Sequence, residues 1–362
     1  MIESWLERKE ICICAGSGGV GKTTTSAAIA LGMAARGKKV AVLTIDPAKR
    51  LANSLGLPEL GNEERQVGAD RFKAAGLPMR GELWAMMLDA KRTFDDLIEL
   101  HAPDAATRDA VLSNRIYKEL SSAVAGSQEY MAMEKLHELH QEGRYDLLVL
   151  DTPPTRNALD FIDAPKKLSA FIDSRSLQFF TAPGFLGLKV FGRGASVLFS
   201  VMKRATGVDL LEDLSGFFRS FGDMASGFRE RAVGVNQLLG DSRTAFVLVT
   251  SPRVDAIDEA AFFHRRLLDA GLPFAGVVAN RVHPGVSDED VGRELEQLVG
   301  VPLAGKVLAT LEDERRLAAR DRANLDDLRA RLRRRPMIEV PYLDDDIHDL
   351  DGLRRMDEYL FA

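Results

Sequence analysis

The chain has 362 residues, of which 46% are hydrophobic and 28% are charged, and its formal net charge is −6. This composition is ordinary for a soluble globular protein, and the net negative charge gives no reason to expect nucleic acid as a partner. The length exceeds the size at which one hydrophobic core usually keeps growing, so we expect one large domain with an insertion, or two domains.

The first predicted elements are a strand, a glycine-rich loop and a helix. Residues Ile11–Ala15 form an apolar run typical of a buried strand, Gly16–Thr23 read GSGGVGKT, and Thr24–Ala35 favour a helix. The loop fits the phosphate-loop pattern G-x-x-x-x-G-K-[ST] in its expected strand–loop–helix context. Glycines let the backbone turn tightly and direct its amides at phosphate oxygens, and the positive end of the following helix adds to this attraction.

This loop supplies most of the predicted nucleotide-binding residues. We expect Lys22 to reach the β- and γ-phosphates of ATP, and the hydroxyl of Thr23 to bind Mg²⁺. The whole predicted phosphate-binding set is Gly16, Ser17, Gly18, Gly19, Val20, Gly21, Lys22, Thr23 and Thr24. The alternative is a glycine-rich turn between a strand and a helix that binds no ligand.

The two cysteines of the chain, Cys12 and Cys14, lie two residues apart on the first predicted strand and therefore point to the same face. Such neighbours suit neither a disulfide nor a zinc site, so we interpret both as small core residues in a reducing compartment. No charged-then-apolar leader precedes this strand, and no uninterrupted run of about 18 apolar residues occurs. We therefore expect a cytoplasmic protein with no stable membrane insertion.

Four further apolar runs are predicted strands. They are Lys39–Ile45, which precedes Asp46, Tyr145–Leu150, which precedes Asp151, Ala245–Thr250, and Phe274–Ala279, which precedes Asn280. Continuous apolar runs separated by helical patterns predict an α/β fold, with a mostly parallel sheet and helices on both of its faces. Ligands bind beyond the carboxyl ends of such strands, where the loop glycine Gly16 and the three polar residues just named all fall.

Two long stretches, about 89–140 and 159–240, have no strand character. We predict that they form a helical subdomain inserted into a single phosphate-loop ATPase domain spanning residues 1–362. Half of the 18 phenylalanines of the chain fall in a 50-residue window of the second stretch, at Phe179, Phe180, Phe185, Phe191, Phe199, Phe217, Phe218, Phe221 and Phe228. Either the subdomain buries its own phenylalanines, or they form an apolar surface that a client segment or a membrane face occupies in one nucleotide state.

Two acidic segments resemble those of a known family. Asp46-Pro47-Ala48 resembles the first switch, and Asp151–Thr155 (DTPPT) the second switch, of the arsenite-pump and tail-anchored-protein-targeting ATPases, which belong to the deviant-Walker-A group of phosphate-loop proteins. Residues 114–122, 127–134 and 155–161 are similar to segments of bacterial members. The resemblance covers most of the chain and is strongest over residues 10–60 and 110–165.

The resemblance implies an ATPase in which two copies, or two halves, face each other across the bound nucleotide. It implies that Asp46 orients or deprotonates the attacking water, that Asp151 holds Mg²⁺ through a water, and that Asn280 contacts adenine. The implied metal site is Thr23, with Asp46 and Asp151 acting through water, and Pro341 lies in the loop beside the base. The alternatives are helix N-caps at the two aspartates and an ordinary loop residue at Asn280.

One departure from the family concerns the residue after the first glycine of the loop. Family members usually carry a second lysine there, which reaches across the dimer to the partner's nucleotide, whereas this chain has Ser17. Serine supplies no cation to the developing phosphate charge, so we expect slow turnover by a homodimer. The open alternatives are a substitute cation, Lys49 or Arg50, and a heteromer with a paralogous ATPase that retains the lysine.

Two further departures concern cysteine. Arsenite pumps use a metalloid site of three thiolates from different helices, which Cys12 and Cys14 on one strand cannot form. Eukaryotic targeting factors clamp their dimer through zinc with a C-x-x-C pair, and this chain has none. With a single phosphate loop, we also expect no pseudo-dimer within the chain.

Three functional hypotheses follow. The first is an ATP-hydrolysing dimeric switch that opens and closes around a client, an apolar protein segment. The second is the catalytic subunit of an anion or arsenite efflux system. The third is a weakly hydrolysing, nucleotide-binding half of a heteromer. The presence of both catalytic candidates, Asp46 and Lys22, favours the first over the third, and the missing thiolates weaken the second.

Overall fold

The computed structural model describes residues 1–46, 49–115, 117–118, 127–153, 163–167, 169–170, 210–285, 292–343 and 345–362. Parts of both predicted switches, Pro47–Ala48 and Pro154–Thr155, lie outside the described residues, as do residues 156–161 of the family resemblance.

The chain divides into two compact units. The first comprises Met1–Met87, Leu139–Leu159 and Leu239–Ala362, and the second comprises Leu88–Glu138 and Asp160–Leu238. The boundaries that we expected for an inserted helical subdomain, 89–140 and 159–240, remain a prediction.

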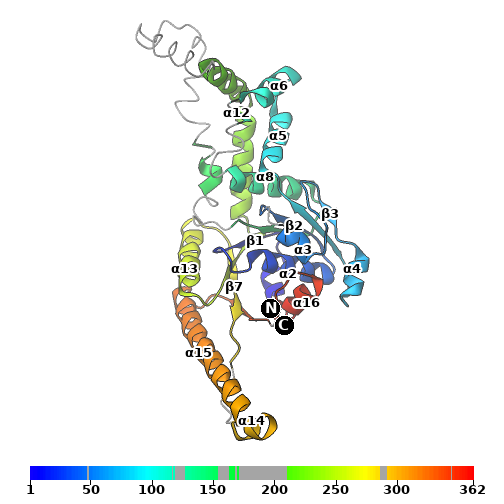
Figure 1. Ribbon diagram of the computed structural model, residues 1–362. Coiled ribbons are helices and arrows are strands. Elements are labelled where there is room, and N and C mark those ends of the chain that lie inside the picture. The colour runs from blue at the N-terminus through cyan, green and yellow to red at the C-terminus, as the bar shows by residue number, and fades with distance from the viewer. Residues whose placement is uncertain are drawn as a thin grey trace. The chain divides into compact units, whose positions relative to one another are not determined.

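The first unit is built on an eight-stranded sheet with the order β3-β4-β2-β5-β1-β6-β7-β8 (Figure 1). The strands are β1 (Ile11–Ala15), β2 (Lys39–Thr44), β3 (Arg65–Gln66), β4 (Glu82–Met87), β5 (Leu147–Asp151), β6 (Thr244–Thr250), β7 (Phe274–Val282) and β8 (Met337–Pro341). Every neighbouring pair is parallel except β3 and β4. The predicted α/β fold with a mostly parallel sheet is therefore confirmed, and the carboxyl ends of seven strands meet at one edge.

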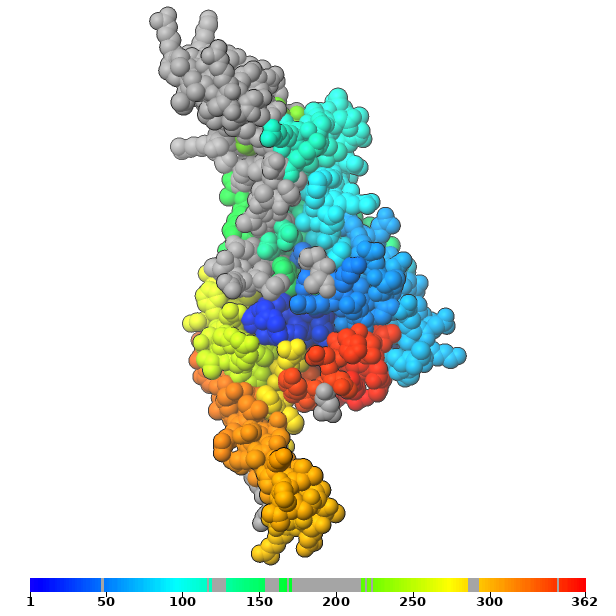
Figure 2. All heavy atoms as spheres, in the orientation of Figure 1, coloured from blue at the N-terminus to red at the C-terminus, as the bar shows by residue number. Residues whose placement is uncertain are grey.

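Helix α2 (Lys22–Ala35) packs against the central strands and is buried along nearly its whole length. Its residues are mostly alanine and other small or apolar types, as expected for a helix that is covered on all sides. The C-terminal helix α16 (Leu350–Leu360), red in Figures 1 and 2, packs on α2. Gly32 makes this close packing possible, because a Cβ there would collide with Asp357 and with the ring of Phe361.

The remaining helices of the first unit are shorter or more exposed. They are α1 (Ile2–Leu6), α3 (Arg50–Ser54), α4 (Ala69–Ala74), α13 (Val254–Asp269), α14 (Gly292–Val299) and α15 (Val301–Arg331). Helix α13 packs on β6 and β7, and α15 contacts both α13 and β7. Across the part of the chain that the structure describes, none of the helices has the length and apolar character that crossing a membrane requires.

The second unit contains α5 (Ala90–His101), α6 (Ala105–Ser113) and most of α8 (Ser127–Glu142) and α12 (Leu210–Gly240). Its core is aromatic: Phe217, Phe221 and Phe228 are at most 3% exposed, and Phe228 packs 5.9 Å from Phe94 between ring centroids. For these three phenylalanines the buried-core interpretation is correct. Five members of the phenylalanine-rich window, at positions 179, 180, 185, 191 and 199, lie outside the described residues.

A buried ion pair lies within the second unit. The carboxylate of Glu134 on α8 is fully buried, accepts a hydrogen bond from Nε of Arg231 on α12, and accepts another from the hydroxyl of Tyr130 at 3.0 Å. A buried carboxylate is costly unless its oxygens are paired, so these two donors hold α8 and α12 in one arrangement.

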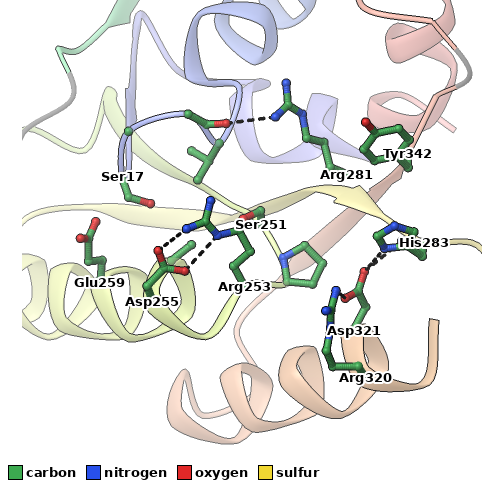
Figure 3. Close-up of a pocket in the computed structure, with 15 residues that line it drawn as sticks. Ser17, Ser251, Arg253, Asp255, Glu259, Arg281, His283, Arg320, Asp321 and Tyr342 are labelled. Atoms are coloured by element: carbon green, nitrogen blue, oxygen red, sulfur yellow. Dashed lines mark hydrogen bonds and ion pairs between the residues drawn. The ribbon is translucent and has the colours of Figure 1, made fainter. Parts of the chain in front are cut away.

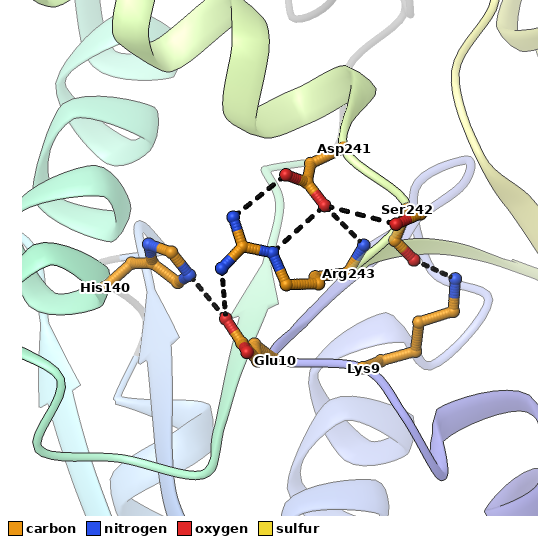
Figure 4. Close-up of polar contacts among 6 residues, drawn as sticks. All are labelled: Lys9, Glu10, His140, Asp241, Ser242 and Arg243. Atoms are coloured by element: carbon orange, nitrogen blue, oxygen red, sulfur yellow. Dashed lines mark hydrogen bonds and ion pairs between the residues drawn. The ribbon is translucent and has the colours of Figure 1, made fainter.

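A polar network crosses the amino-terminal ends of β1 and β6 (Figure 4). Glu10 Oε2 lies 2.7 Å from His140 Nε2 and accepts a hydrogen bond from Arg243 Nη1 at 3.2 Å. Asp241 accepts hydrogen bonds from the backbone N–H of Arg243 at 2.8 Å and from its guanidinium, which lower the pKa of the Asp241 carboxyl. These residues tie β1, β6 and α8 together at the sheet edge opposite the phosphate loop.

Candidate nucleotide-binding site

The phosphate loop joins the carboxyl end of β1 to α2, and glycines fix its path. Gly16, Gly19 and Gly21 have φ values of 155°, 78° and 91°, a region that side chains rarely adopt. A Cβ at Gly16 would also collide with the carbonyl oxygen of Val249 on β6. Gly21 is the N-cap of α2, so the helix begins at Lys22, two residues before the predicted start at Thr24.

The ammonium of Lys22 lies folded against its own loop. Its Nζ donates a hydrogen bond to the carbonyl oxygen of Ser17 at 2.7 Å, and the residue is only 7% exposed. Burial lowers the pKa of Lys22, whereas the charges of Asp151 and Asp46 raise it. The loop therefore contains a largely desolvated cation, which an incoming anion can engage.

Beneath the loop, two hydroxyls converge on one carboxylate. Oδ2 of Asp151 accepts hydrogen bonds from Oγ1 of Thr23 at 2.6 Å and from Oγ1 of Thr44 at 2.9 Å. Asp151 is 1% exposed, and burial raises its pKa to about 6. Its other oxygen, Oδ1, is buried with no hydrogen-bond partner among the described residues.

These oxygens fit Mg²⁺. Hydroxyl and carboxylate oxygens are the ligands that this ion prefers, and it usually keeps several waters and takes few ligands from the protein. The unpartnered Oδ1 of Asp151 can accept a hydrogen bond from such a water. Within the described residues no group of three or more His, Cys, Asp or Glu side chains could hold a metal ion.

Asp46 lies apart from the loop cavities described below. Its backbone N–H donates to Oγ1 of Thr44 at 3.2 Å, and its carboxylate lies 3.8 Å from the guanidinium of Arg50. Together with Lys49 it lines a separate space of about 20 Å³. The structure therefore joins Thr23 directly to Asp151, and Thr44 connects Asp46 to the same carboxylate.

The residues predicted to contact the base share one cavity of about 300 Å³. Its lining includes Gly21, Thr24, Asn280, Pro341 and Tyr342. Asn280 is 7% exposed, and its Nδ2 donates to the carbonyl oxygen of Val20 at 3.0 Å. The structure therefore brings the predicted Thr24, Asn280 and Pro341 together beside the loop, although Asn280 lies within β7 and not beyond its end.

A larger cavity, of about 610 Å³, also borders the loop (Figure 3). Ser17, Gly18, Gly19 and Val20 form part of its lining, and the rest comes from β7, from α15 and from the segments after β6, β7 and β8. Opposite charges are paired along its rim: Arg253 donates to Asp255, and Arg320 to Asp321 at 3.1 Å. The buried Asp321 also lies 2.6 Å from Nδ1 of His283, whose ring stacks on Tyr342.

Sequence reasoning missed several residues of this site. Thr44 is the last residue of β2, and its polar side chain within an apolar run was a usable signal. Arg281 lines both cavities, and His283 reaches Asp321 on α15, some 40 positions later in the sequence. No local sequence pattern predicts the pairing of His283 with Asp321, because it depends on how α15 packs back against the sheet.

The cysteines are as predicted. Cys12 and Cys14 are both fully buried in the core, with their sulfur atoms 4.0 Å apart. Both sulfurs face α2 and its neighbours, because alternate residues of a strand share one face.

Comparison with known proteins gives one family. The sequence profile described as "Anion-transporting ATPase" matches residues 9–298. A protein named "Putative arsenical pump-driving ATPase 1" from Aquifex aeolicus is 26% identical over 284 residues, covering 76% of this chain and 63% of that protein. The protein named "ATPase GET3" from Malassezia globosa is 24% identical over 286 residues, covering 78% of this chain and 76% of that protein.

A third relative matches a shorter region more closely. The "Putative arsenical pump-driving ATPase" of Halobacterium salinarum is 32% identical over 173 residues, 46% of this chain and 26% of that protein. The chain thus aligns with between about a quarter and three quarters of the length of these relatives. Because the family profile spans most of its length, the chain belongs to the anion-transporting ATPase family, as its loop and switch segments predicted.

Proposed function

We propose that the protein binds ATP on the loop Gly16–Thr24 and hydrolyses it to ADP and phosphate. The observation that carries this proposal is the hydrogen bond between Thr23 and Asp151, which connects the last residue of the phosphate-loop motif to a buried carboxylate at the end of β5. Membership of an ATPase family supports the same conclusion.

The residues of the site suggest a division of roles. Loop amides and Lys22 bind and neutralise the phosphates, while Asn280, Thr24 and Pro341 surround the base in the cavity of about 300 Å³. Asp46 orients or deprotonates the attacking water. Phosphoryl transfer needs little covalent help from a protein, so these positioning and electrostatic roles account for most of the rate.

Mg²⁺ is the expected cofactor. Thr23 would hold it directly, and Asp46 and Asp151 through water. When bound, the ion neutralises charge on the phosphate oxygens. The aspartate at position 151 must be ionised for this role, and its hydrogen bonds from Thr23 and Thr44 favour the ionised form against the effect of burial.

The assembly is a further part of the proposal. We expect a homodimer, or a heteromer with a paralogous ATPase that carries a lysine at the position of Ser17. In either assembly, ATP hydrolysis is coupled to opening and closing of the interface between the two subunits. An apolar protein segment is the proposed client. The proposed location is the cytoplasm, a reducing compartment, because Cys12 and Cys14 are free thiols and form no disulfide.

An anion efflux ATPase is the second candidate, which the names of the Aquifex and Halobacterium relatives favour. Against a thiolate metalloid site, both cysteines of the chain are buried on β1. Steady-state ATPase activity measured with and without arsenite or antimonite separates the two candidates. Stimulation by either anion would favour efflux, and unchanged turnover would favour the client-handling switch.

Two variants test the proposal itself. Lys22→Ala should lose nucleotide binding, whereas Lys73→Ala, which removes an exposed lysine of α4, should bind as the wild type does. Asp46→Asn should bind ATP and release no phosphate. Nucleotide affinity of Lys22→Ala equal to the wild type would refute the loop assignment, and wild-type turnover by Asp46→Asn would remove that residue from its role.

A further inference from the structure

Arg281 adopts a backbone conformation that is unusual for its residue type. Its φ is +60°, in the left-handed region, and the register between β7 and β8 shifts between Ala279 and Val282. A residue with a side chain adopts this region at a cost of about 1–2 kcal/mol, and such strain tends to persist at functional sites. Arg281 is therefore held in place against its own preference.

This conformation turns two consecutive side chains toward the phosphate loop. Residues of a regular strand point alternately to opposite faces. Here Asn280 donates to the carbonyl oxygen of Val20 at 3.0 Å, and Nη1 of Arg281 donates to that of Gly19 at 3.3 Å. Figure 3 shows the Arg281 side chain rising from β7 to the loop.

The two donors differ in exposure and in charge. Asn280 is buried and neutral, whereas Arg281 is exposed and lines both the cavity of about 610 Å³ and that of about 300 Å³. A guanidinium carries five N–H groups in one plane, and the contact with Gly19 engages Nη1 alone. The other N–H groups match the geometry of phosphate oxygens, which arginine binds well.

Three other arginines near the loop are paired with carboxylates. Arg253 is paired with Asp255, Arg320 with Asp321, and Arg50 with Asp46. Ser17, on the same cavity wall, brings no charge. Among the described residues that line the larger cavity, Arg281 is the arginine without a carboxylate partner.

We propose that Arg281 is a second phosphate-binding cation, which acts with Lys22 on the nucleotide of its own chain. It supports the carbonyl of Gly19 in the absence of ligand and transfers hydrogen bonds to the terminal phosphates when a triphosphate binds. This inference rests on the proposed ATP binding. Arg281, in place of Lys49 or Arg50, then supplies the positive charge that Ser17 lacks.

Three variants and one control test the proposal. Arg281→Gln removes the charge and keeps N–H donors, Arg281→Lys keeps the charge, and Arg281→Gly removes both but relieves the backbone strain. Arg253→Gln changes an exposed arginine on the opposite wall of the same cavity and is the control. Affinities for ADP and for a non-hydrolysable ATP analogue are measured by titration, with and without Mg²⁺, together with kcat, KM and the Tm of the ligand-free protein.

The expected pattern separates charge from structure. Arg281→Gln and Arg281→Gly should bind the ATP analogue about tenfold more weakly, with a smaller effect on ADP, and should lower kcat, because charge-assisted contacts to phosphate are lost. Arg281→Lys should recover most of the affinity, and Arg253→Gln should stay within about twofold of the wild type. The ligand-free Tm of Arg281→Gly should equal or exceed that of the wild type, since its strain is relieved.

Other outcomes would overturn the inference. If Arg281→Gln binds the ATP analogue as tightly as the wild type while Lys22→Ala does not bind it, Arg281 is no phosphate ligand and ATP binding stands. If Arg281→Lys is as weak as Arg281→Gln, or if all losses follow a lower Tm, the residue only supports the loop. If the wild type binds neither nucleotide, the proposed function and this inference both fail.

Discussion

Two glycines of the phosphate loop share a backbone conformation but have different surroundings, which makes them a matched pair for mutation. Gly19 has a φ of +78°, and no atom lies within 4 Å of the position that a Cβ would take there. A Cβ at Gly21, whose φ is +91°, would collide with Nδ2 of Asn280. Alanine at either position must adopt the left-handed region, but only alanine at Gly21 must displace a neighbour.

The magnitudes follow from these contacts. The left-handed conformation should cost about 1–2 kcal/mol in both variants. Gly21→Ala must also move the amide of Asn280 away from the carbonyl oxygen of Val20, and an unsatisfied buried acceptor costs about 1–3 kcal/mol. We therefore expect a loss in unfolding free energy of about 1–2 kcal/mol for Gly19→Ala and about 2–5 kcal/mol for Gly21→Ala.

Urea unfolding followed by circular dichroism measures both losses, and a double-mutant cycle isolates the collision. Asn280→Ala alone should cost about 1–3 kcal/mol, because Val20 loses its donor. In Gly21→Ala with Asn280→Ala the collision is gone, so the combined loss should be smaller than the sum of the single losses. Equal losses for Gly19→Ala and Gly21→Ala, or strict additivity in the double variant, would refute this reasoning.

Three further predictions concern stability. Arg231→Met should cost about 3–5 kcal/mol in urea unfolding, because it leaves the buried carboxylate of Glu134 without its cation, and adding Glu134→Leu should restore most of the loss. Gly32→Ala should lower the Tm by several degrees, because the added Cβ collides with the packed ring of Phe361, which should cost about 1–3 kcal/mol of unfolding free energy. The hydrogen bonds to Asp241 lower its pKa, so the stability it adds is present above about pH 4 and is lost as the pH falls. Asp241→Asn should therefore lower the Tm slightly at pH 7, by at most about 2 °C for so exposed a group, and by less at about pH 2; an equal change at both would contradict it.

The sequence was sufficient to predict the central strands of the sheet and the phosphate loop. Apolar runs such as Lys39–Ile45 are long, continuous and bounded by polar residues, so hydrophobic pattern alone identifies them as β2 and its neighbours. Three strands were not predicted: β3, β4 and β8. The two residues of β3 are both exposed, and Glu339 interrupts the apolar pattern of β8, so neither presents the uniform apolar run of a buried strand. Strand β4 begins at Glu82 but continues as an apolar run over residues 83–87, so its hydrophobic pattern was a usable signal.

The contacts of the site were predictable only in part. The phosphate-loop pattern fixes the spacing of Gly16, Lys22 and Thr23, and strand ends fix the neighbourhood of Asp151. The position of Arg281 depends on a register shift between β7 and β8, and the pairing of His283 with Asp321 depends on the return of α15. Such features come from long-range packing, which leaves no periodic pattern in the sequence.

The phosphate loop is anchored from three directions before any ligand arrives, by Lys22 on the carbonyl of Ser17, by Arg281 on that of Gly19 and by Asn280 on that of Val20. Its conformational entropy is therefore largely lost during folding and not at the encounter with substrate. A receptor that is preorganised in this way spends little of the interaction energy on ordering itself, so encounter should need no slow rearrangement of the loop and affinity should depend mainly on ligand charge.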